Sequence, residues 1–223
     1  MGKLIVIEGV DASGKATQTK LLYEYLKSSF EKVEKIEFPD YESNSSSLVK
    51  MYLSGEFGKN AEDVSPYIAS TFFAADRYAS YKTKWEKLYN DDYVIIADRY
   101  VTANMIHQAS KFDNNEEKEE FLSWLTDFEY NLYKLPQPTL KIFLNVPPEV
   151  SFELMRERLN KFTEKAEKDI HESNKEYLEK TYENAKHIAE KYGFEIINCV
   201  RDEKMRTIED IQSEIRRIVD NAI

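Results

Sequence analysis

The sequence predicts an α/β fold in which one parallel β-sheet is covered by helices on both faces. Five short apolar runs rich in β-branched residues have the length and composition of buried strands. Helix-length segments separate these runs, and such alternation is typical of parallel sheets. The motif G-x-x-x-x-G-K follows the first run directly and is typical of phosphate-binding loops. At 223 residues the chain is expected to form a single domain, residues 1–223.

The five apolar runs are the predicted strands, taken in chain order. They are KLIVIE at 3–8, KVEKIEF at 32–38, YVIIAD at 93–98, LKIFLNV at 140–146 and FEIINCV at 194–200. In parallel sheets, ligands bind beyond the carboxyl ends of the strands. Polar side chains gather at those ends, among them Glu8, Asp40, Asp98 and Asn145, so a site is expected there.

The helices are predicted from apolar spacing and from start signals. Directly after the glycine motif, apolar residues recur at helical spacing between 21 and 30. Ser65-Pro66 combines an N-cap residue with a proline suited to the first helical position, and it begins a segment that extends to about Leu88. Two more helices are expected to start at Pro147-Pro148-Glu149 and at Thr207, which with Asp210 resembles a capping box.

The glycine motif is interpreted as a phosphate-binding loop because it joins a strand directly to an amphipathic helix. In such a loop, backbone N–H groups turn toward phosphate oxygens, and the helix N-terminus adds positive potential. Lys15 would place a mobile cation between the β- and γ-phosphates. The residues expected to bind a nucleotide through this loop are Gly9, Val10, Asp11, Ala12, Ser13, Gly14, Lys15, Ala16 and Thr17, and the resemblance described below makes that nucleotide ATP.

Ala16 stands where this type of loop usually carries a Ser or Thr that binds Mg²⁺. Thr17 is no simple replacement, because one residue along a helix turns the side chain by ~100°. Carboxylates, waters and the oxygens of the nucleotide must then hold the metal, which Mg²⁺ tolerates because it keeps several waters. Glu8, Asp11 and Asp98 are the nearby carboxylates.

Composition argues against several other classes of protein. A formal net charge of −10 does not suit a surface that coats nucleic acid. One cysteine, Cys199, and three scattered His residues provide neither a disulfide framework nor a zinc pattern, which favours a reducing compartment. No apolar stretch approaches the ~20 residues needed to span a bilayer, and the first apolar run does not fit a secretory signal. We therefore expect a cytoplasmic protein without nucleic-acid or membrane partners.

Several stretches, in order and over nearly the whole chain, resemble the thymidylate kinases. They are IEGVDASGK at 7–15, FPDYESNSSSLVKMYLSGEFG at 38–58, TFFAADR at 71–77, DRYVTANMIHQ at 98–108 and INCVRDEKMRTIEDI at 197–211. The resemblance implies a P-loop NTPase fold, with a five-stranded parallel sheet centred on the loop-bearing strand and a helical lid. It also implies transfer of the γ-phosphoryl group of ATP to dTMP, giving dTDP and ADP for dTTP biosynthesis, with Mg²⁺ and on a homodimer.

Residue chemistry and the resemblance together predict the acceptor site. Arg99 suits a bidentate grip on the acceptor phosphate. Phe73 and Arg77 lie four residues apart on one helix face, and the resemblance assigns them to stacking on thymine and to its carbonyl edge. Asn104 and Gln108 are also four apart, and either amide is able to read the N3–H and O4 of thymine.

Further acceptor residues follow from the resemblance. It puts Asp11 near the sugar 3′ hydroxyl, with a role in holding the metal. His107 stands where the family usually has Tyr, whose ring crowds the place of a ribose 2′ hydroxyl, so the strength of deoxyribose selection is open. The remaining residues expected to bind dTMP are Pro39, Leu53 and Tyr100.

A charge-dense segment at approximately 156–175 is expected to form a helical lid over ATP, as the resemblance implies. Ala12 stands where some family members have an Arg inside the loop, so the lid is expected to supply that positive charge. Arg156 and Arg158 are both candidates for this charge, and Arg158 is favoured as a third catalytic residue beside Lys15 and Arg99. Its candidate helpers are Lys161, Lys165 and Lys168. Glu172 matches a family carboxylate that lies near the metal and acts directly or through water.

Two other functions fit parts of the sequence. A deoxynucleoside kinase that phosphorylates thymidine would share the loop but would give Arg99 no phosphate to hold. A nucleotide-dependent switch or binding module gains slight support from Ala16, but a GTPase switch would need an N-K-x-D stretch near the fourth strand, and LNVPPEV contains none.

Overall fold

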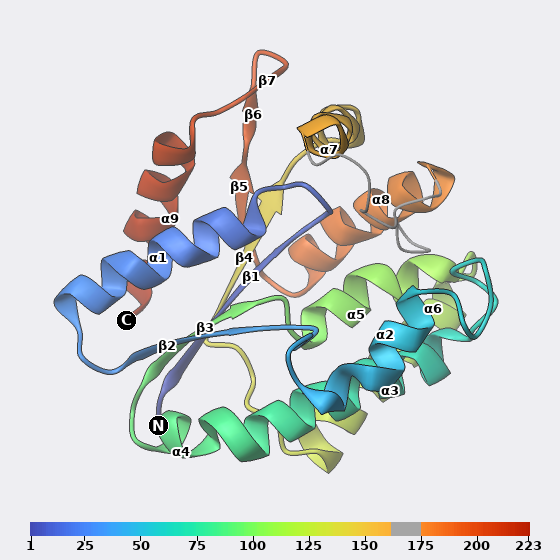
Figure 1. Ribbon diagram of the computed structural model, residues 1–223, viewed down its shortest axis with the longest axis horizontal. Coiled ribbons are helices and arrows are strands. Elements are labelled where there is room, and N and C mark those ends of the chain that lie inside the picture. Colours follow the sequence, from blue (N-terminus) through green and yellow to red (C-terminus); the bar gives the residue numbers. More distant parts are fainter. Residues whose placement is uncertain (162–174) are drawn as a thin grey trace.

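The computed structural model describes residues 1–161 and 175–223, with side chains for 1–155 and 176–223 (Figure 1). A five-stranded parallel sheet has the strand order β2-β3-β1-β4-β5, so the loop-bearing strand lies at its centre, as predicted. The strands are β1 (Lys3–Gly9), β2 (Val33–Glu37), β3 (Val94–Asp98), β4 (Leu140–Asn145) and β5 (Glu195–Asn198). All five predicted strands are confirmed, each trimmed or extended by no more than two residues at an end.

The central strand has a hydrophobic core on each face, because successive side chains of a strand point to opposite sides. Leu4 and Val6 belong to one core and Ile5 and Ile7 to the other, and all four are completely buried. In register, Ile5 lies between Ile96 of β3 and Leu140 of β4. A continuous apolar run therefore marks a strand covered on both sides.

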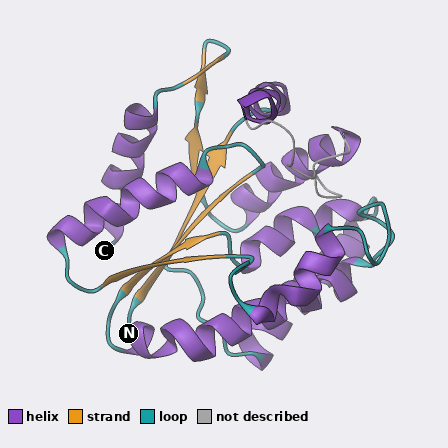
Figure 2. Cartoon of the chain, viewed as in Figure 1, coloured by secondary structure: helices purple, strands orange, loops and turns teal. Residues whose placement is uncertain are grey.

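Helices form a layer on each face of the sheet (Figure 2). Leu22 and Leu26 of α1 and Ile215 of α9 pack with Ile5, and in Figure 1 these two helices lie on one side of the sheet. The opposite layer includes α4, α5, α6 and α8. The helices are α1 (Lys15–Ser29), α2 (Ser47–Leu53), α3 (Pro66–Ser80), α4 (Glu86–Asn90), α5 (Val101–His107), α6 (Asn115–Thr126), α7 (Pro148–Lys161), α8 (Lys175–Lys191) and α9 (Ile208–Ala222), with short 3₁₀ turns at η1 (Asn44–Ser46) and η3 (Ala109–Lys111).

The long helical segment predicted from Ser65 is continuous but not uniform. Ser65 caps α3, since its Oγ accepts a hydrogen bond from the Ile68 backbone N–H at 3.3 Å. After α3 the chain forms a π-helical stretch, η2 (Tyr81–Trp85), and continues as α4 to Asn90. A second π-helical stretch, η4 (Asp127–Leu132), follows α6. Apolar spacing indicated helix in the first segment but gave no sign of the wider turns.

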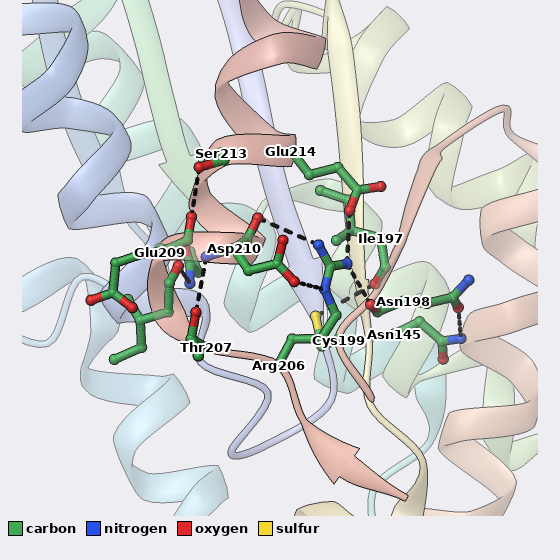
Figure 3. Close-up of polar contacts among 12 residues, drawn as sticks. Asn145, Ile197, Asn198, Cys199, Arg206, Thr207, Glu209, Asp210, Ser213 and Glu214 are labelled. Carbon is green, nitrogen blue, oxygen red and sulfur yellow. Dashed lines mark hydrogen bonds and ion pairs between the residues drawn. The ribbon is translucent and has the colours of Figure 1, made fainter. Parts of the chain in front are cut away.

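A short antiparallel pair, β6 (Val200–Arg201) and β7 (Lys204–Met205), was not predicted. Arg206 fastens it to α9: its Nε donates to Asp210 at 2.7 Å and its NH1 donates to Glu214 at 2.7 Å (Figure 3). NH1 also donates to the backbone oxygen of Asn198 at 2.8 Å. The cap at Thr207 is confirmed, because its Oγ1 accepts from the Asp210 backbone N–H at 3.2 Å, while the Asp210 carboxylate pairs with Arg206.

Among the helices that the structure describes, none is long and apolar enough to cross a membrane.

Candidate active site

The loop between β1 and α1 is shaped by its glycines. Gly14, the residue before α1, has a φ of 86°, a conformation that glycine adopts without strain. Gly9 has no room for a side chain, because an added Cβ would lie 2.5 Å from Ser13 Oγ and 3.1 Å from the backbone oxygen of Leu144. The turn therefore follows from backbone freedom at one glycine and close packing at the other.

Lys15 is the first residue of α1, and its side chain folds back over the loop. Its Nζ donates to the backbone oxygens of Gly9 and Val10, at 2.8 Å in both cases. Burial and the nearby charge of Arg99 lower the pKa of Lys15 to about 8, although Asp11 opposes this shift. A phosphate that binds here would bring negative charge close to Lys15 and would therefore raise its pKa back toward the usual value for a lysine.

A pocket that is open to solvent lies beside the loop. Nine of the ten residues predicted to bind the acceptor line it: Asp11, Pro39, Leu53, Phe73, Arg77, Arg99, Asn104, His107 and Gln108. The side chain of Tyr100 does not, because it is buried in the core and its hydroxyl donates to the backbone oxygen of Pro136 at 3.0 Å. Three lining residues, Phe38, Tyr41 and Ala103, were not predicted, although all lie within or beside the quoted motifs.

Arg99 connects the loop to the pocket. It follows β3 with a φ of 65°, and its NH2 donates to Asp11 Oδ1 at 2.5 Å. Its NH1 lies 2.9 Å from His107 Nε2, which must be the acceptor because a guanidinium only donates. Burial would lower the pKa of Arg99, but the charges of Asp11, Glu8 and Asp98 and the hydrogen bond to Asp11 together raise it, so the side chain stays cationic. The pocket thus has one permanent cation at its junction with the loop.

Arg77 of α3 lines the pocket, and an unpredicted residue, Glu129 of η4, holds it there. Arg77 Nε and NH2 each donate to one oxygen of the Glu129 carboxylate at 2.6 Å. The two side chains are 1% and 0% exposed. Burial would lower the pKa of Arg77, but the charge of Glu129 and its hydrogen bonds raise that pKa overall. The pKa of Glu129 is raised as well, because burial disfavours the charged carboxylate. No local spacing signals this pair, because its members are 52 residues apart.

The two candidate amides differ in their partners. Asn104 Nδ2 donates to the backbone oxygen of Ser70 at 3.4 Å. Gln108 follows α5 directly, is 1% exposed, and its Oε1 accepts no hydrogen bond within the part of the chain that the structure describes. A buried acceptor without a donor costs free energy, so Gln108 suits a ligand that supplies an N–H group.

The family model for thymidylate kinase matches residues 7–215, nearly the whole chain. The chain belongs to the thymidylate kinase family. The thymidylate kinase of Schizosaccharomyces pombe is 28% identical over 223 residues, covering 99% of this chain and 92% of that relative. The Mycobacterium tuberculosis H37Rv thymidylate kinase is 31% identical over 179 residues, covering 80% and 81%.

A solved thymidylate kinase structure from Candida albicans resembles this fold with a TM-score of 0.73 and 24% sequence identity, over 99% of this chain and 92% of the other. This likeness confirms the predicted P-loop NTPase fold. Family membership makes the chain a phosphotransferase, as the sequence predicted, and the comparisons favour neither the deoxynucleoside kinase nor the switch.

In this member of the thymidylate kinase family, Glu8, Asp11 and Asp98 are the carboxylates near the phosphate loop. Glu8 is fully buried and is hydrogen-bonded within the protein. Its Oε1 accepts from the Tyr100 backbone N–H at 3.0 Å and from Thr102 Oγ1 at 2.6 Å, and burial raises its pKa. Asp11 and Asp98 are only half-buried. Among the described residues, no group of three or more His, Cys, Asp or Glu side chains is arranged to hold a metal ion.

Two predicted functional residues fall where the structure gives no side chains. Arg158 lies in the last part of α7, whose side chains are outside the description. Glu172 and most of the predicted lid, 156–175, lie outside the described residues. These roles stay predictions.

Proposed function

We propose that the chain transfers the γ-phosphoryl group of ATP to dTMP, giving ADP and dTDP, as a step in dTTP biosynthesis. One observation carries the proposal: the phosphate loop and the pocket share Asp11, which Arg99 contacts at 2.5 Å. Phosphates gathered by the loop and a monophosphate in the pocket would therefore meet beside the same cation.

Charge neutralisation and alignment are the main tasks of the protein in such a transfer. The loop N–H groups and Lys15 would hold the phosphates of ATP, and Arg99 would grip the phosphate of dTMP. An oxygen of that phosphate attacks the γ-phosphorus, forming one P–O bond while the bond to the β–γ bridging oxygen breaks. No covalent nucleophile of the protein is needed.

The thymine base would occupy the end of the pocket that α3 and α5 line. Phe73 is half-buried and lies edge-on to Tyr52, with ring centroids 6.1 Å apart, so one face remains for stacking. Arg77 would donate to a base carbonyl. The unpartnered Oε1 of Gln108 supports the choice of Gln108 as the acceptor for N3–H, since this buried oxygen accepts no hydrogen bond within the described residues.

We further propose that Mg²⁺ accompanies ATP. Asp11, half-buried at the rim of the pocket, would hold the ion directly or through water, because Ala16 provides no hydroxyl. Bound Mg²⁺ would neutralise charge on the nucleotide phosphates. Arg158 and Glu172 keep their predicted roles as a lid cation and a carboxylate near the metal.

We also propose that the protein is a cytoplasmic homodimer. Three apolar side chains are exposed in this region: Leu48 of α2 (46%), Ile68 of α3 (54%) and Phe57, which lies between these helices in the sequence (37%). A self-associating face on α2 and α3 would cover them. Cys199 is the one cysteine of the sequence and is buried as a free thiol, which suits a reducing compartment. Sedimentation should give a dimer that Ile68→Lys converts to a monomer.

An ADP-release assay across nucleoside monophosphates and thymidine, with and without Mg²⁺, tests the function. We expect dTMP to be the best acceptor, thymidine to be inactive and transfer to require Mg²⁺. Preference for thymidine, or ATP turnover that no acceptor stimulates, would contradict the proposal.

A further inference from the structure

A buried ion pair forms part of the pocket wall. Burying two charges costs desolvation free energy, so the presence of this pair needs an explanation. Arg77 and Glu129 are both essentially inaccessible to water, and two hydrogen bonds of 2.6 Å join them. Replacing such a pair with apolar side chains of similar volume often leaves stability unchanged or improves it. Stability alone is therefore a weak explanation for an Arg–Glu pair at this position.

The pair leaves one particular part of the guanidinium for a ligand. Glu129 occupies Nε and NH2, so NH1 is the nitrogen without a short hydrogen bond: its contact to the backbone oxygen of Tyr100 is 3.4 Å. Because the carboxylate takes two nitrogens of a rigid planar group, it also fixes the plane in which the NH1 hydrogens point. The Arg77 side chain cannot swing without breaking both bonds.

Glu129 also balances the charge of Arg77. An unpaired guanidinium at this end of the pocket would compete with Arg99 for the phosphate of an acceptor nucleotide, because Arg99 shares its charge with Asp11 through a single hydrogen bond between side chains that are 21% and 18% exposed. A neutralised guanidinium instead offers a directional donor, which suits an uncharged base carbonyl. The two ends of the pocket thereby differ: Arg99, half-buried and near the loop, suits a phosphate, and Arg77 suits a base.

We propose that Glu129 is a positioning residue that determines which pyrimidine base the pocket accepts, by fixing Arg77 NH1 toward the 4-position of the ring. Thymine and uracil carry a carbonyl oxygen there and accept a hydrogen bond. Cytosine carries an amino group, which would face the N–H donor and leave both groups unpaired. This inference rests on the proposed function.

The fold explains how Glu129 reaches Arg77. Glu129 lies in the π-helical stretch η4, where Leu132 is 68% exposed while Glu129 is completely buried. The Glu129 backbone oxygen accepts from the Leu135 N–H at 3.1 Å, which closes the end of this stretch. π-helical turns commonly occur at functional sites because they change the direction of a side chain.

Two substitutions remove the geometry and the charge of Glu129 in turn, and this inference requires both. Glu129→Asp keeps the charge but is too short to hold Nε and NH2 together in the same way, and Glu129→Gln keeps the length but loses the charge. Leu125→Ala is the matched control, because Leu125 is completely buried in α6 just before η4 and does not contact the pocket. Steady-state kinetics with dTMP and dCMP, on variants shown to be folded by circular dichroism, give the readout.

We expect both Glu129 variants to lower the ratio of kcat/KM for dTMP over dCMP about tenfold, mainly through KM for dTMP, with kcat within about threefold of the unaltered protein. Leu125→Ala should lower the melting temperature but leave the ratio unchanged. An unchanged ratio in folded Glu129→Asp, or an equal fall in Leu125→Ala, would overturn this inference alone. Failure of the unaltered protein to phosphorylate dTMP would overturn the proposed function as well.

Discussion

Between Gly9 and Thr17 the chain offers a ligand mainly its backbone, whereas the acceptor pocket offers side chains from α2, α3 and α5. In the loop, shape depends on the absence of side chains, as at Gly9, where a Cβ would collide with Ser13. In the pocket, each cation is held by a carboxylate: Arg99 by Asp11 and Arg77 by Glu129. One region is local in sequence, and the other is assembled from distant parts of the chain.

This difference indicates which substitutions should reduce phosphoryl transfer and which should weaken binding of the acceptor. Lys15 is the main charged side chain of the loop, so its loss should affect transfer itself. The pocket divides its work among several side chains, so single changes there should be smaller and should affect mainly the acceptor.

Lys15→Ala is expected to have the largest effect. In the proposed mechanism Lys15 neutralises charge on the phosphates of ATP, so kcat should fall roughly 10³-fold when it is lost. The fold should survive, because Lys15 Nζ bonds only to loop backbone oxygens. Single-turnover kinetics measure the loss, and Lys20→Ala, an exposed change on the same helix, is the control. Near-normal turnover in a folded Lys15→Ala protein would contradict the role of the loop.

Arg99→Ala should lower kcat/KM for dTMP about 10²-fold, because a charged partner of the acceptor phosphate disappears from a largely buried site. KM for ATP should change little, which would separate the pocket from the loop. Initial rates over a matrix of ATP and dTMP concentrations distinguish the two constants. Arg217→Ala, an exposed change on α9, is the control, and an equal loss of ATP affinity in Arg99→Ala would show that the two regions are not separable.

The same contrast explains how much the sequence could predict. The loop and its residues were predictable because G-x-x-x-x-G-K encodes a contiguous backbone shape, and β1 was predictable because its apolar run is continuous. Most pocket residues were found because the family motifs contain them. Glu129 was missed because its link to Arg77 spans 52 residues, and neither the π-helical stretch η4 nor the β6–β7 pair has a sequence pattern that indicates it.

Gln108→Met tests whether a pocket side chain is kept for binding at the expense of stability. The change removes a buried acceptor that has no donor among the described residues, so the melting temperature should stay constant or rise. KM for dTMP should rise about tenfold, because N3–H of the base would lose its partner. Calorimetry and kinetics on one preparation give both values. Asn104→Leu is the comparison, and a larger KM effect there would make Asn104 the base reader.

The smallest expected effect is a pH dependence of ATP binding that originates in the loop. Lys15 has a pKa of about 8 in the unliganded protein, and the charge of bound phosphates should raise it, so binding takes up a proton. Affinity is then constant well below pH 8 and falls as the pH rises through 8, by about threefold between pH 7.5 and 8.5, where the nucleotide phosphates are already ionised.

Titration calorimetry in two buffers with different ionisation enthalpies measures this proton uptake directly. Lys15→Met should abolish it. Lys111→Met is the matched control, because burial also lowers the pKa of Lys111 to about 8, but its Nζ binds the backbone oxygen of Ala61 and the hydroxyl of Tyr52 and does not line the acceptor pocket. Proton uptake that survives in Lys15→Met but disappears in Lys111→Met would place the titrating group outside the loop, and the loop would then act through its backbone alone.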